Sequence, residues 1–409
     1  MMTCNALILA GGRVDELGVL TLQRPKSAVP FGGLYRIIDF PLSNLMHSDI
    51  ERVGILSQYR SDSLIHHISS GASWDMYGSQ RGITFLPPMK GTKSSDWYKG
   101  TADAVYQNLE YLYQNRADHV LILSGDHVYK MDYQQLIGFH QRMSADLTIS
   151  FVQSSNRGIS RFGQGVIADD DEEGGRLTQY AEKPSAPISD WVSMTAYLFS
   201  YDVLIELLHN LNSFPAHEHF GRDIFPSLLQ QIRVCGYKFK GYWAYTRTIG
   251  EYWRANMQLL EDSSAIDPGK WQVRTNWMNQ SIHDLAPTRI GNSAEVSASM
   301  VHNGCVIEGV VENSVIFPGV QVHKNAVVRN SILMFNTIVG GGARLDKTIT
   351  DINVQVGNNV CIGDKDMDLQ SEQGIGVVAR ETKIPAGTRI EPGYMIYPDL
   401  KGEKIVEKF

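Results

Sequence analysis

The sequence is poor in cysteine, with four in 409 residues, and none of them forms a CxxC pair. This scarcity argues against a disulfide framework and against a cysteine-ligated metal. We expect Cys4, Cys235, Cys305 and Cys361 to be reduced, buried thiols of a cytoplasmic protein.

The chain also lacks any run of 18 apolar residues and any block of basic residues. Without such a run there is no candidate for a membrane-spanning helix. The start of the chain reads as a strand rather than as a secretory signal. Because the net charge is −7 and both signs are interspersed, the sequence predicts neither a nucleic-acid nor a membrane partner.

Two patterns of apolar residues divide the chain. Up to residue 261, short apolar runs alternate with stretches that have helical spacing. This alternation predicts an α/β domain over 1–261, with ligands at the carboxyl ends of its strands. Residues 262–288 contain few apolar side chains but include proline and glycine, so we expect a surface linker there.

From residue 289 to 409, aliphatic residues recur about every five or six positions, with glycine and asparagine between them. This period predicts a hexapeptide-type parallel β-helix, in which each coil buries its aliphatic residue on the next. Some β-helices of this type are acyltransferases. A structural role is favoured here because no histidine is placed as an acyl-transfer base.

The most informative stretch begins with the apolar run from Ala6 to Ala10, which predicts a buried parallel strand. Gly11 and Gly12 follow at once and Lys26 lies downstream. Glycines after a strand allow backbone amides to approach a phosphate. The alternative is an ordinary tight turn between a strand and a helix.

LILAGG and RPKSAVPFGGLYRIIDFPLSN, within residues 7–44, resemble the start of ADP-glucose pyrophosphorylases (glucose-1-phosphate adenylyltransferases). WYKGTADAV at 97–105 is a more distinctive match to the same family, and it argues against the uridylyl- and guanylyltransferases. The resemblance covers nearly the whole chain. It implies a Rossmann-like nucleotidyltransferase domain followed by a left-handed parallel β-helix. The implied reaction converts ATP and glucose 1-phosphate to ADP-glucose and pyrophosphate, for glycogen or other α-glucan synthesis.

The resemblance also assigns site residues. For catalysis it implies Arg13, Lys26 and Asp126, with Asp126 holding Mg²⁺. For nucleotide binding it implies Leu9, Ala10, Gly11, Gly12, Gln58, Gly100 and Thr101. For sugar-phosphate binding it implies Tyr98, Gly165, Glu182, Lys183 and Ser193. For regulation it implies Gln58 and Trp97 as a relay, and Arg24 and Arg36 as contacts of a nucleotide inhibitor.

Several of these assignments have a plainer alternative. Asp126 follows an apolar run and would suit Mg²⁺ between phosphates, but a turn aspartate that caps a helix has the same pattern. Trp97 and Tyr98 could pack in a core, and an exposed Glu182-Lys183-Pro184 is a common turn.

The chain departs from the family where the triphosphate and the metal would bind. Glu16 stands where the family's GGRGTRL motif has its second arginine, so it places a negative charge there. The second metal aspartate is also missing, because Tyr245 or Thr248 occupies its place, depending on the alignment. Thr195 replaces a glycine of the sugar pocket, and Gln23 replaces a lysine linked to sugar-bisphosphate activation.

Two hypotheses follow. In the first, the chain is a glucose-1-phosphate adenylyltransferase that uses Mg²⁺ and responds to allosteric metabolite effectors. In the second, it is a catalytically impaired regulatory subunit that binds ligands but turns over poorly. The first predicts a homotetramer, and the second predicts a hetero-oligomer with an intact paralogue.

Overall fold

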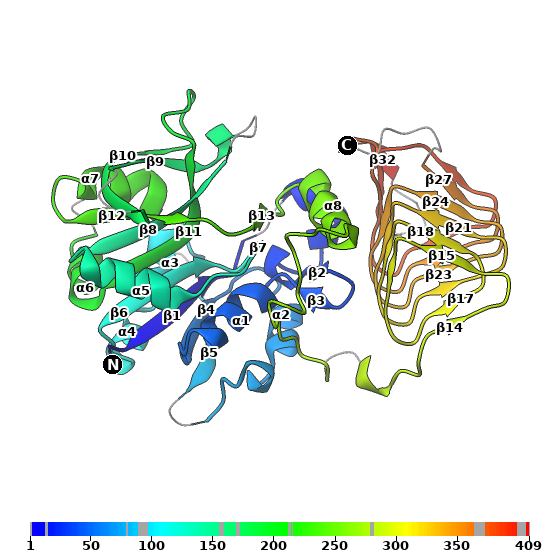
Figure 1. The fold of residues 1–409 in the computed structure, drawn as a ribbon, viewed down its shortest axis with the longest axis horizontal. Coiled ribbons are helices and arrows are strands. Elements are labelled where there is room, and N and C mark those ends of the chain that lie inside the picture. Colours follow the sequence, from blue (N-terminus) through cyan, green and yellow to red (C-terminus); the bar gives the residue numbers. More distant parts are fainter. Residues whose placement is uncertain are drawn as a thin grey trace. The chain divides into compact units, whose positions relative to one another are not determined.

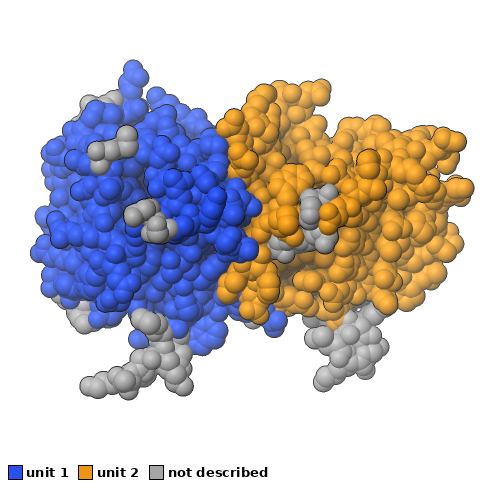
Figure 2. Space-filling view, turned by 90° about the horizontal axis from the view of Figure 1, so that it is seen from below, with its two compact units in different colours: residues 1–12, 40–61, 68–243 blue, residues 13–39, 62–67, 244–409 orange. Residues whose placement is uncertain are grey.

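The computed structural model describes residues 2–12, 15–78, 81–88, 97–154, 159–168, 172–211, 214, 216–278, 282–363, 373–398 and 406–408. The chain divides into two compact units that are discontinuous in sequence (Figure 2). Unit 1 comprises residues 1–12, 40–61 and 68–243, and unit 2 comprises residues 13–39, 62–67 and 244–409. The predicted domains at 1–261 and 289–409, with a linker at 262–288, stay a prediction.

Unit 1 is built on a nine-stranded mixed sheet with the order β5-β4-β1-β6-β11-β8-β12-β10-β9 (Figure 1). Its strands are β1 (Cys4–Leu9), β4 (Arg52–Leu56), β5 (Gly82–Leu86), β6 (His119–Ser124), β8 (Leu147–Gln153), β9 (Gly163–Ile167), β10 (Gly174–Glu182), β11 (Trp191–Ser200) and β12 (Val234–Phe239). β1, β4, β5 and β6 run parallel, whereas β11 is antiparallel to both β6 and β8. The predicted buried parallel strand is therefore β1, and its continuous apolar run is covered on both faces.

Helices flank this sheet, and α5 and α6 pack against its central strands. The α-helices of the chain are α1 (Asp39–His47), α2 (Asp62–Ile68), α3 (Thr101–Tyr106), α4 (Leu109–Gln114), α5 (Tyr133–Arg142), α6 (Tyr201–His209), α7 (Phe225–Leu228) and α8 (Ile249–Met257). Shorter elements are η1 (Asp15–Thr21), η2 (Lys26–Ala28), η3 (Ala72–Trp74), η4 (Ile159–Arg161), η6 (Phe220–Ile224), η7 (Gln258–Leu260), η8 (Ile282–Asp284), β2 (Pro30–Phe31), β3 (Tyr35–Arg36), β7 (His127–Tyr129) and β13 (Trp243–Tyr245). Among the described residues, no helix is both long and apolar enough to cross a bilayer.

Unit 2 contains the predicted parallel β-helix, made of three sheets (Figure 1). The first sheet has β14 (Arg289–Ile290), β17 (Val306–Ile307), β20 (Gln321–Val322), β23 (Ile338–Val339), β26 (Gln355–Val356) and β29 (Lys383–Ile384). The second has β15 (Glu295–Ser297), β18 (Val310–Glu312), β21 (Val327–Arg329), β24 (Arg344–Asp346), β27 (Cys361–Ile362) and β30 (Arg389–Ile390). The third has β16 (Met300–Val301), β19 (Val315–Ile316), β22 (Ile332–Leu333), β25 (Thr348–Thr350), β28 (Gly376–Val378), β31 (Tyr394–Ile396) and the antiparallel β32 (Val406–Lys408).

Buried aliphatic residues on the strands and asparagines at the corners explain why the coils stack. On the second sheet, Val311, Val328, Leu345 and Ile362 pair in register and are buried in turn. At the corners, asparagines adopt the left-handed conformation that they tolerate better than most residues. The amide of Asn313 donates to Asn330 at 2.8 Å, one coil further on. The predicted period of apolar and polar residues therefore corresponds to real stacking in the β-helix.

The four cysteines are free thiols, as expected. Cys235 and Cys305 are buried, but Cys4 and Cys361 are only partly buried. Cys361 stays partly exposed because Ile362, the next residue of its strand, faces the core, and neighbouring side chains of a strand point to opposite faces.

The buried His140 of α5 gives unit 1 a pH-dependent stability. Burial lowers the pKa of His140 to about 3, while its ring nitrogens contact Thr148 Oγ1 at 2.8 Å and Ser200 Oγ at 3.2 Å. The unfolded chain protonates this histidine below its ordinary pKa of 6.5, whereas the folded chain does not. Stability is therefore lost as the pH falls from about 6.5 toward 3.

We expect His140 to account for about 2 kcal/mol of the loss in unfolding free energy between pH 7 and pH 5. His140→Gln retains hydrogen-bonding capacity but does not titrate, so its stability should fall less over this range. Thermal unfolding at the two pH values measures the difference, with the exposed His47→Gln as the control. Equal losses in the wild type and His140→Gln would contradict the assignment.

Candidate functional site

The residues predicted to bind ligands fall in both units, and each group is described within its own unit. Leu9, Ala10, Gly11, Gly12, Gln58, Tyr98, Asp126, Lys183 and the remaining sugar-phosphate residues belong to unit 1. Lys26, Arg24 and Arg36 belong to unit 2. Arg13 lies outside the described residues.

The two glycines after β1 have different reasons for being glycine. A Cβ on Gly11 would lie 2.9 Å from the backbone nitrogen of Gln58 and 3.3 Å from the carbonyl oxygen of Leu56. Gly11 is therefore required by packing between neighbouring strands. A Cβ on Gly12 would meet nothing within 4 Å. Packing does not explain Gly12, and its role beside a phosphate stays a prediction.

Asp126 lies in the turn after β6, directly beside the end of β1. The Gly125 amide donates to the Leu9 carbonyl at 3.0 Å and fixes this turn to β1. The Asp126 carboxylate accepts a hydrogen bond from Ser124, lies 3.4 Å from His127 Nε2, and keeps 22% of its side chain exposed. This position at the carboxyl end of a central parallel strand is where α/β sheets bind ligands.

The sequence segment around Tyr98 is held by hydrogen bonds rather than left free. The Tyr98 hydroxyl donates to the Leu86 carbonyl at 2.8 Å and accepts from Asn108 at 3.0 Å. The Gln58 side chain accepts from the Tyr98 amide at 2.7 Å, whereas 58% of Trp97 is exposed. Burial raises the pKa of Tyr98 to about 12, so this hydroxyl stays protonated. Gln58 thus contacts the residue next to Trp97, and the relay by Gln58 and Trp97 stays a prediction.

Gly100 and Thr101 have a clear packing role. A Cβ on Gly100 would lie 2.2 Å from the carbonyl oxygen of Glu218, which accepts from the Ala102 amide at 2.9 Å. The Thr101 hydroxyl accepts from the Phe220 amide at 3.1 Å. The start of α3 is therefore occupied by protein groups, and nucleotide binding by Gly100 and Thr101 stays a prediction.

The sugar-phosphate residues lie on β9, β10 and β11 or directly after them. Tyr180 donates to the Glu182 carboxylate at 2.8 Å, so this carboxylate is positioned from within β10. Lys183 follows β10 with φ of 48° and is exposed, and no carboxylate among the described residues pairs with its ammonium group. Ser193 is buried on β11, and a Cβ on Gly165 would collide with Phe151. Gly165 is therefore explained by packing, whereas the Lys183 ammonium group has no carboxylate partner within the described part of the chain.

Lys26 in unit 2 is buried, with 2% of its surface exposed. Its Nζ lies 4.4 Å from the centre of the Tyr245 ring, which is close enough for a cation–π contact. Tyr245 is one of the two positions where the family's second metal aspartate would fall. In this chain the position carries an aromatic ring that covers the lysine.

Thr248, the other candidate for that aspartate, caps α8. Its hydroxyl accepts from the Glu251 amide at 3.2 Å, and the Glu251 carboxylate accepts from the Thr248 amide at 3.0 Å. This reciprocal pair is a capping box, and its Thr-x-x-Glu pattern is visible in the sequence. Among the described residues, no three His, Cys, Asp or Glu side chains gather as a metal site. Mg²⁺ binding by Asp126, with phosphate and water as further ligands, stays a prediction.

Glu16 is paired with Arg247, a residue that sequence reasoning missed. Its Oε1 lies 2.7 Å from Arg247 Nε. Partial burial raises the pKa of Glu16, but hydrogen bonds from its own backbone and from Arg247, with the charges of Arg247 and Lys26, hold the pKa below its ordinary value. The negative charge at Glu16 is therefore locally compensated rather than isolated.

Arg24 and Arg36, the predicted inhibitor contacts, are both buried in unit 2. Arg24 forms an ion pair with Asp351 of the β-helix and donates to the Leu20 carbonyl at 3.0 Å. Burial lowers the pKa of Arg36 to about 10. The positive charge of Arg24 also lowers this pKa, whereas the negative charge of Asp39 raises it. An anion could reach Arg24 only by displacing Asp351, so inhibitor binding there stays a prediction.

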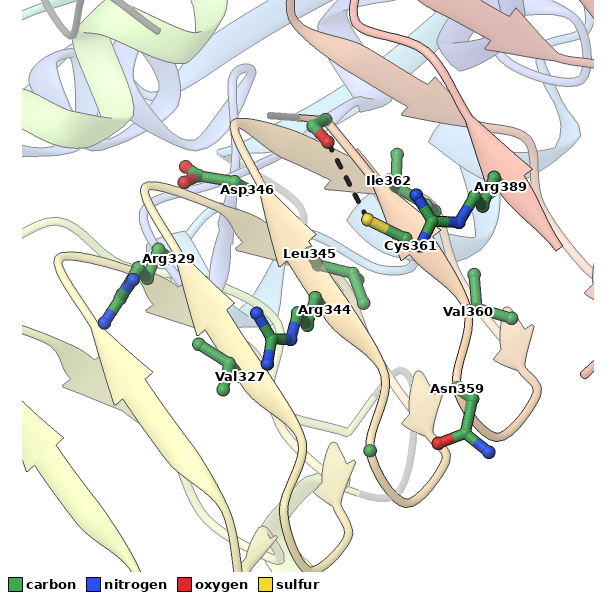
Figure 3. Close-up of a pocket in the computed structure, with 12 residues that line it drawn as sticks. Val327, Arg329, Arg344, Leu345, Asp346, Asn359, Val360, Cys361, Ile362 and Arg389 are labelled. Carbon is green, nitrogen blue, oxygen red and sulfur yellow. Dashed lines mark hydrogen bonds between the residues drawn. The ribbon is translucent and has the colours of Figure 1, made fainter. Parts of the chain in front are cut away.

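A groove of about 710 Å³ lies on the outer face of the second β-helix sheet (Figure 3). Arg344 and Arg389 flank Cys361 there, and Arg329 pairs with Glu312 at 2.9 Å. None of the residues that the sequence predicts to bind ligands lines this groove. It is a feature of the β-helix surface separate from the sites described above.

The mixed sheet, the glycines after β1 and the carboxylate after β6 agree with a nucleotidyltransferase domain, and a family model for nucleotidyl transferases matches residues 5–262. A second model, for a GlmU-like C-terminal hexapeptide region, matches residues 285–378 and agrees with the predicted left-handed β-helix. The fold class is therefore confirmed.

Proteins named glucose-1-phosphate adenylyltransferase are similar over nearly the whole chain. One from Desulfitobacterium hafniense (strain Y51) is 40% identical over 398 residues, which cover 97% of this chain and 98% of the relative. One from Acetivibrio thermocellus is 39% identical over 412 residues, covering 98% and 94%. One from Thermomicrobium roseum is 41% identical over 414 residues, covering 98% and 94%. The chain belongs to the glucose-1-phosphate adenylyltransferase family, as predicted.

Thr195 on β11 is strained, because its φ is 51° where the family has a glycine. A β-branched residue in the left-handed region costs about 1–2 kcal/mol relative to glycine.

We expect Thr195→Gly to raise the free energy of unfolding by about 1 kcal/mol. Denaturant titration measures this, and Thr178→Gly on β10, where φ is not positive, should instead destabilise. Destabilisation by Thr195→Gly would show that its side-chain contacts outweigh the strain.

Proposed function

We propose that this chain transfers the adenylyl group of ATP to glucose 1-phosphate, which yields ADP-glucose and pyrophosphate for α-glucan synthesis. The observation that carries the proposal is the partly exposed Asp126 carboxylate, fixed beside the end of β1. The reaction is the one for which the similar proteins are named. The implied setting is the cytoplasm, with allosteric metabolite effectors and a homotetramer.

In this proposal the sugar phosphate oxygen attacks the α-phosphorus in line, and pyrophosphate leaves. Asp126 would hold Mg²⁺ together with phosphate oxygens, and the ion would neutralise charge that develops on the phosphates. Lys183 would orient the phosphate of glucose 1-phosphate, while Glu182 would accept from sugar hydroxyls. Lys26 would add positive charge toward the leaving group.

A second candidate is a regulatory subunit with little turnover, which would partner an intact paralogue. It is favoured by Tyr245 and Thr248, because both residues have structural contacts where a second metal carboxylate would fall. Mg²⁺ held by one protein carboxylate should bind more weakly than Mg²⁺ held by two.

The decisive measurement is pyrophosphate release by the full chain with ATP, glucose 1-phosphate and Mg²⁺. We expect turnover on the order of 10 per second, as for an ordinary enzyme, and a fall of at least about 100-fold in Asp126→Asn, a typical loss when a charge-stabilising group is removed. Asp132→Asn is the control, because Asp132 caps α5 and asparagine preserves that role. Background release that rises only when an intact homologue is added would instead establish the regulatory subunit.

Lys183→Ala tests the sugar side separately. Loss of one charge-assisted hydrogen bond should weaken glucose 1-phosphate binding by about 1.5–3 kcal/mol and leave ATP binding nearly unchanged. Isothermal calorimetry with each ligand measures both effects, and the exposed Lys240→Ala of the same unit is the control. Equal losses for the two ligands would assign Lys183 to the scaffold.

A further inference from the structure

Four side chains from separate segments of unit 2 meet at the start of α8. Glu16 comes from η1, Lys26 from η2, Tyr245 from β13, and Arg247 from the turn before α8. Arg247 Nη1 lies 3.0 Å from the Tyr245 hydroxyl, and Arg247 Nε lies 2.7 Å from Glu16 Oε1. Lys26 contacts the ring of the same tyrosine at 4.4 Å. Arg247 and Lys26 therefore contact the same tyrosine, Arg247 at the hydroxyl and Lys26 at the ring.

The cluster is buried at one end and open at the other. Lys26 is 2% exposed, whereas the side chains of Arg247 and Glu16 are 35% and 44% exposed. The carboxylate of Glu251 is engaged by the backbone amides of Arg247 and Thr248, at 3.1 and 3.0 Å. Glu16 is thus a partly exposed carboxylate that pairs with the partly exposed Arg247 guanidinium.

The exposure of the Glu16–Arg247 pair makes it easy to exchange. Exposed ion pairs contribute at most about 1 kcal/mol to stability, because water screens them. A guanidinium has five N–H donors, and the Glu16 and Tyr245 contacts use only two of them. A phosphate can accept two parallel hydrogen bonds from arginine, so it can replace a carboxylate with little loss to the fold.

We propose that Arg247 is a phosphate-binding residue of this chain, and that Glu16 is an internal carboxylate which occupies Arg247 until a nucleotide phosphate displaces it. This inference rests on the proposed function and names a residue of unit 2 that would bind the nucleotide phosphates. Tyr245 positions the guanidinium through its hydroxyl, and its ring covers the buried Lys26. Arg247 would thus supply the positive charge that the family places at position 16, where this chain has Glu16.

The test measures binding of inorganic tripolyphosphate to the full chain by calorimetry, so it needs no turnover. Arg247→Gln should weaken tripolyphosphate binding by at least about tenfold. Arg247→Lys should restore only part of the affinity, because lysine keeps the positive charge but lacks the planar guanidinium that forms two parallel hydrogen bonds. Glu16→Gln removes the competing carboxylate and should tighten binding by about threefold or more. In the Arg247→Gln background, Glu16→Gln should have little effect, since the two act as one unit.

The chain offers a matched control in the Arg329–Glu312 pair, which has a 2.9 Å contact and exposures of 39% and 48%. Arg329→Gln and Glu312→Gln should leave tripolyphosphate binding unchanged. Equal effects of Arg247→Gln and Arg329→Gln would overturn the proposal, as would no measurable binding by the wild type. Weaker binding in Glu16→Gln with a lowered melting temperature would make the pair a structural bridge instead.

The outcomes separate this inference from the proposed function. Tripolyphosphate binding that depends on Arg247, without pyrophosphate release, would support the inference and favour the regulatory subunit. Ordinary turnover that is unchanged in Arg247→Gln would support adenylyl transfer and overturn the role of Arg247.

Discussion

The buried ion pair between Arg24 and Asp351 is the interaction on which the arrangement of unit 2 depends. The two side chains are 4% and 2% exposed and lie 327 residues apart in the sequence. A buried charge that loses its partner is strongly destabilising, by about 3–5 kcal/mol. The pair therefore holds the segment after β1 against a coil of the β-helix. Lys26 lies two residues beyond Arg24, so the β-helix helps to set the position of the predicted catalytic lysine.

This dependence gives the β-helix a role beyond that of a spacer. Trp253 of α8 donates to the Asn330 carbonyl at 2.8 Å, so α8 is also fixed to a coil. Arg247 and Thr248 precede α8, and their positions follow from that contact. The segment with Lys26 and the segment with Arg247 are thus supported by the same stack of coils. A change in the β-helix can alter both cations together.

Much of this fold could be predicted from the sequence, because the apolar pattern of β1 and the period of the β-helix depend on local spacing. The division into units could not, since it depends on contacts such as Arg24–Asp351 that join distant segments. The role of a glycine cannot be read from the sequence alone, for a physical reason. Gly11 and Gly12 look alike in sequence, and only the neighbouring backbone shows that one is required by packing. The capping box at Thr248 was visible in the sequence, but the partner of Glu16 was not.

Two of the departures from the family change the local charge. A carboxylate disappears at the metal position, where Tyr245 or Thr248 now stands, and another appears at Glu16. Glu16 pairs with Arg247, which lies between residues 245 and 248 in the sequence. The sugar side differs, because Lys183 remains exposed without a carboxylate partner in the described structure. In the proposed reaction, the sugar phosphate and the Mg²⁺–triphosphate would depend on different residues, so a change at one binding site need not alter the other.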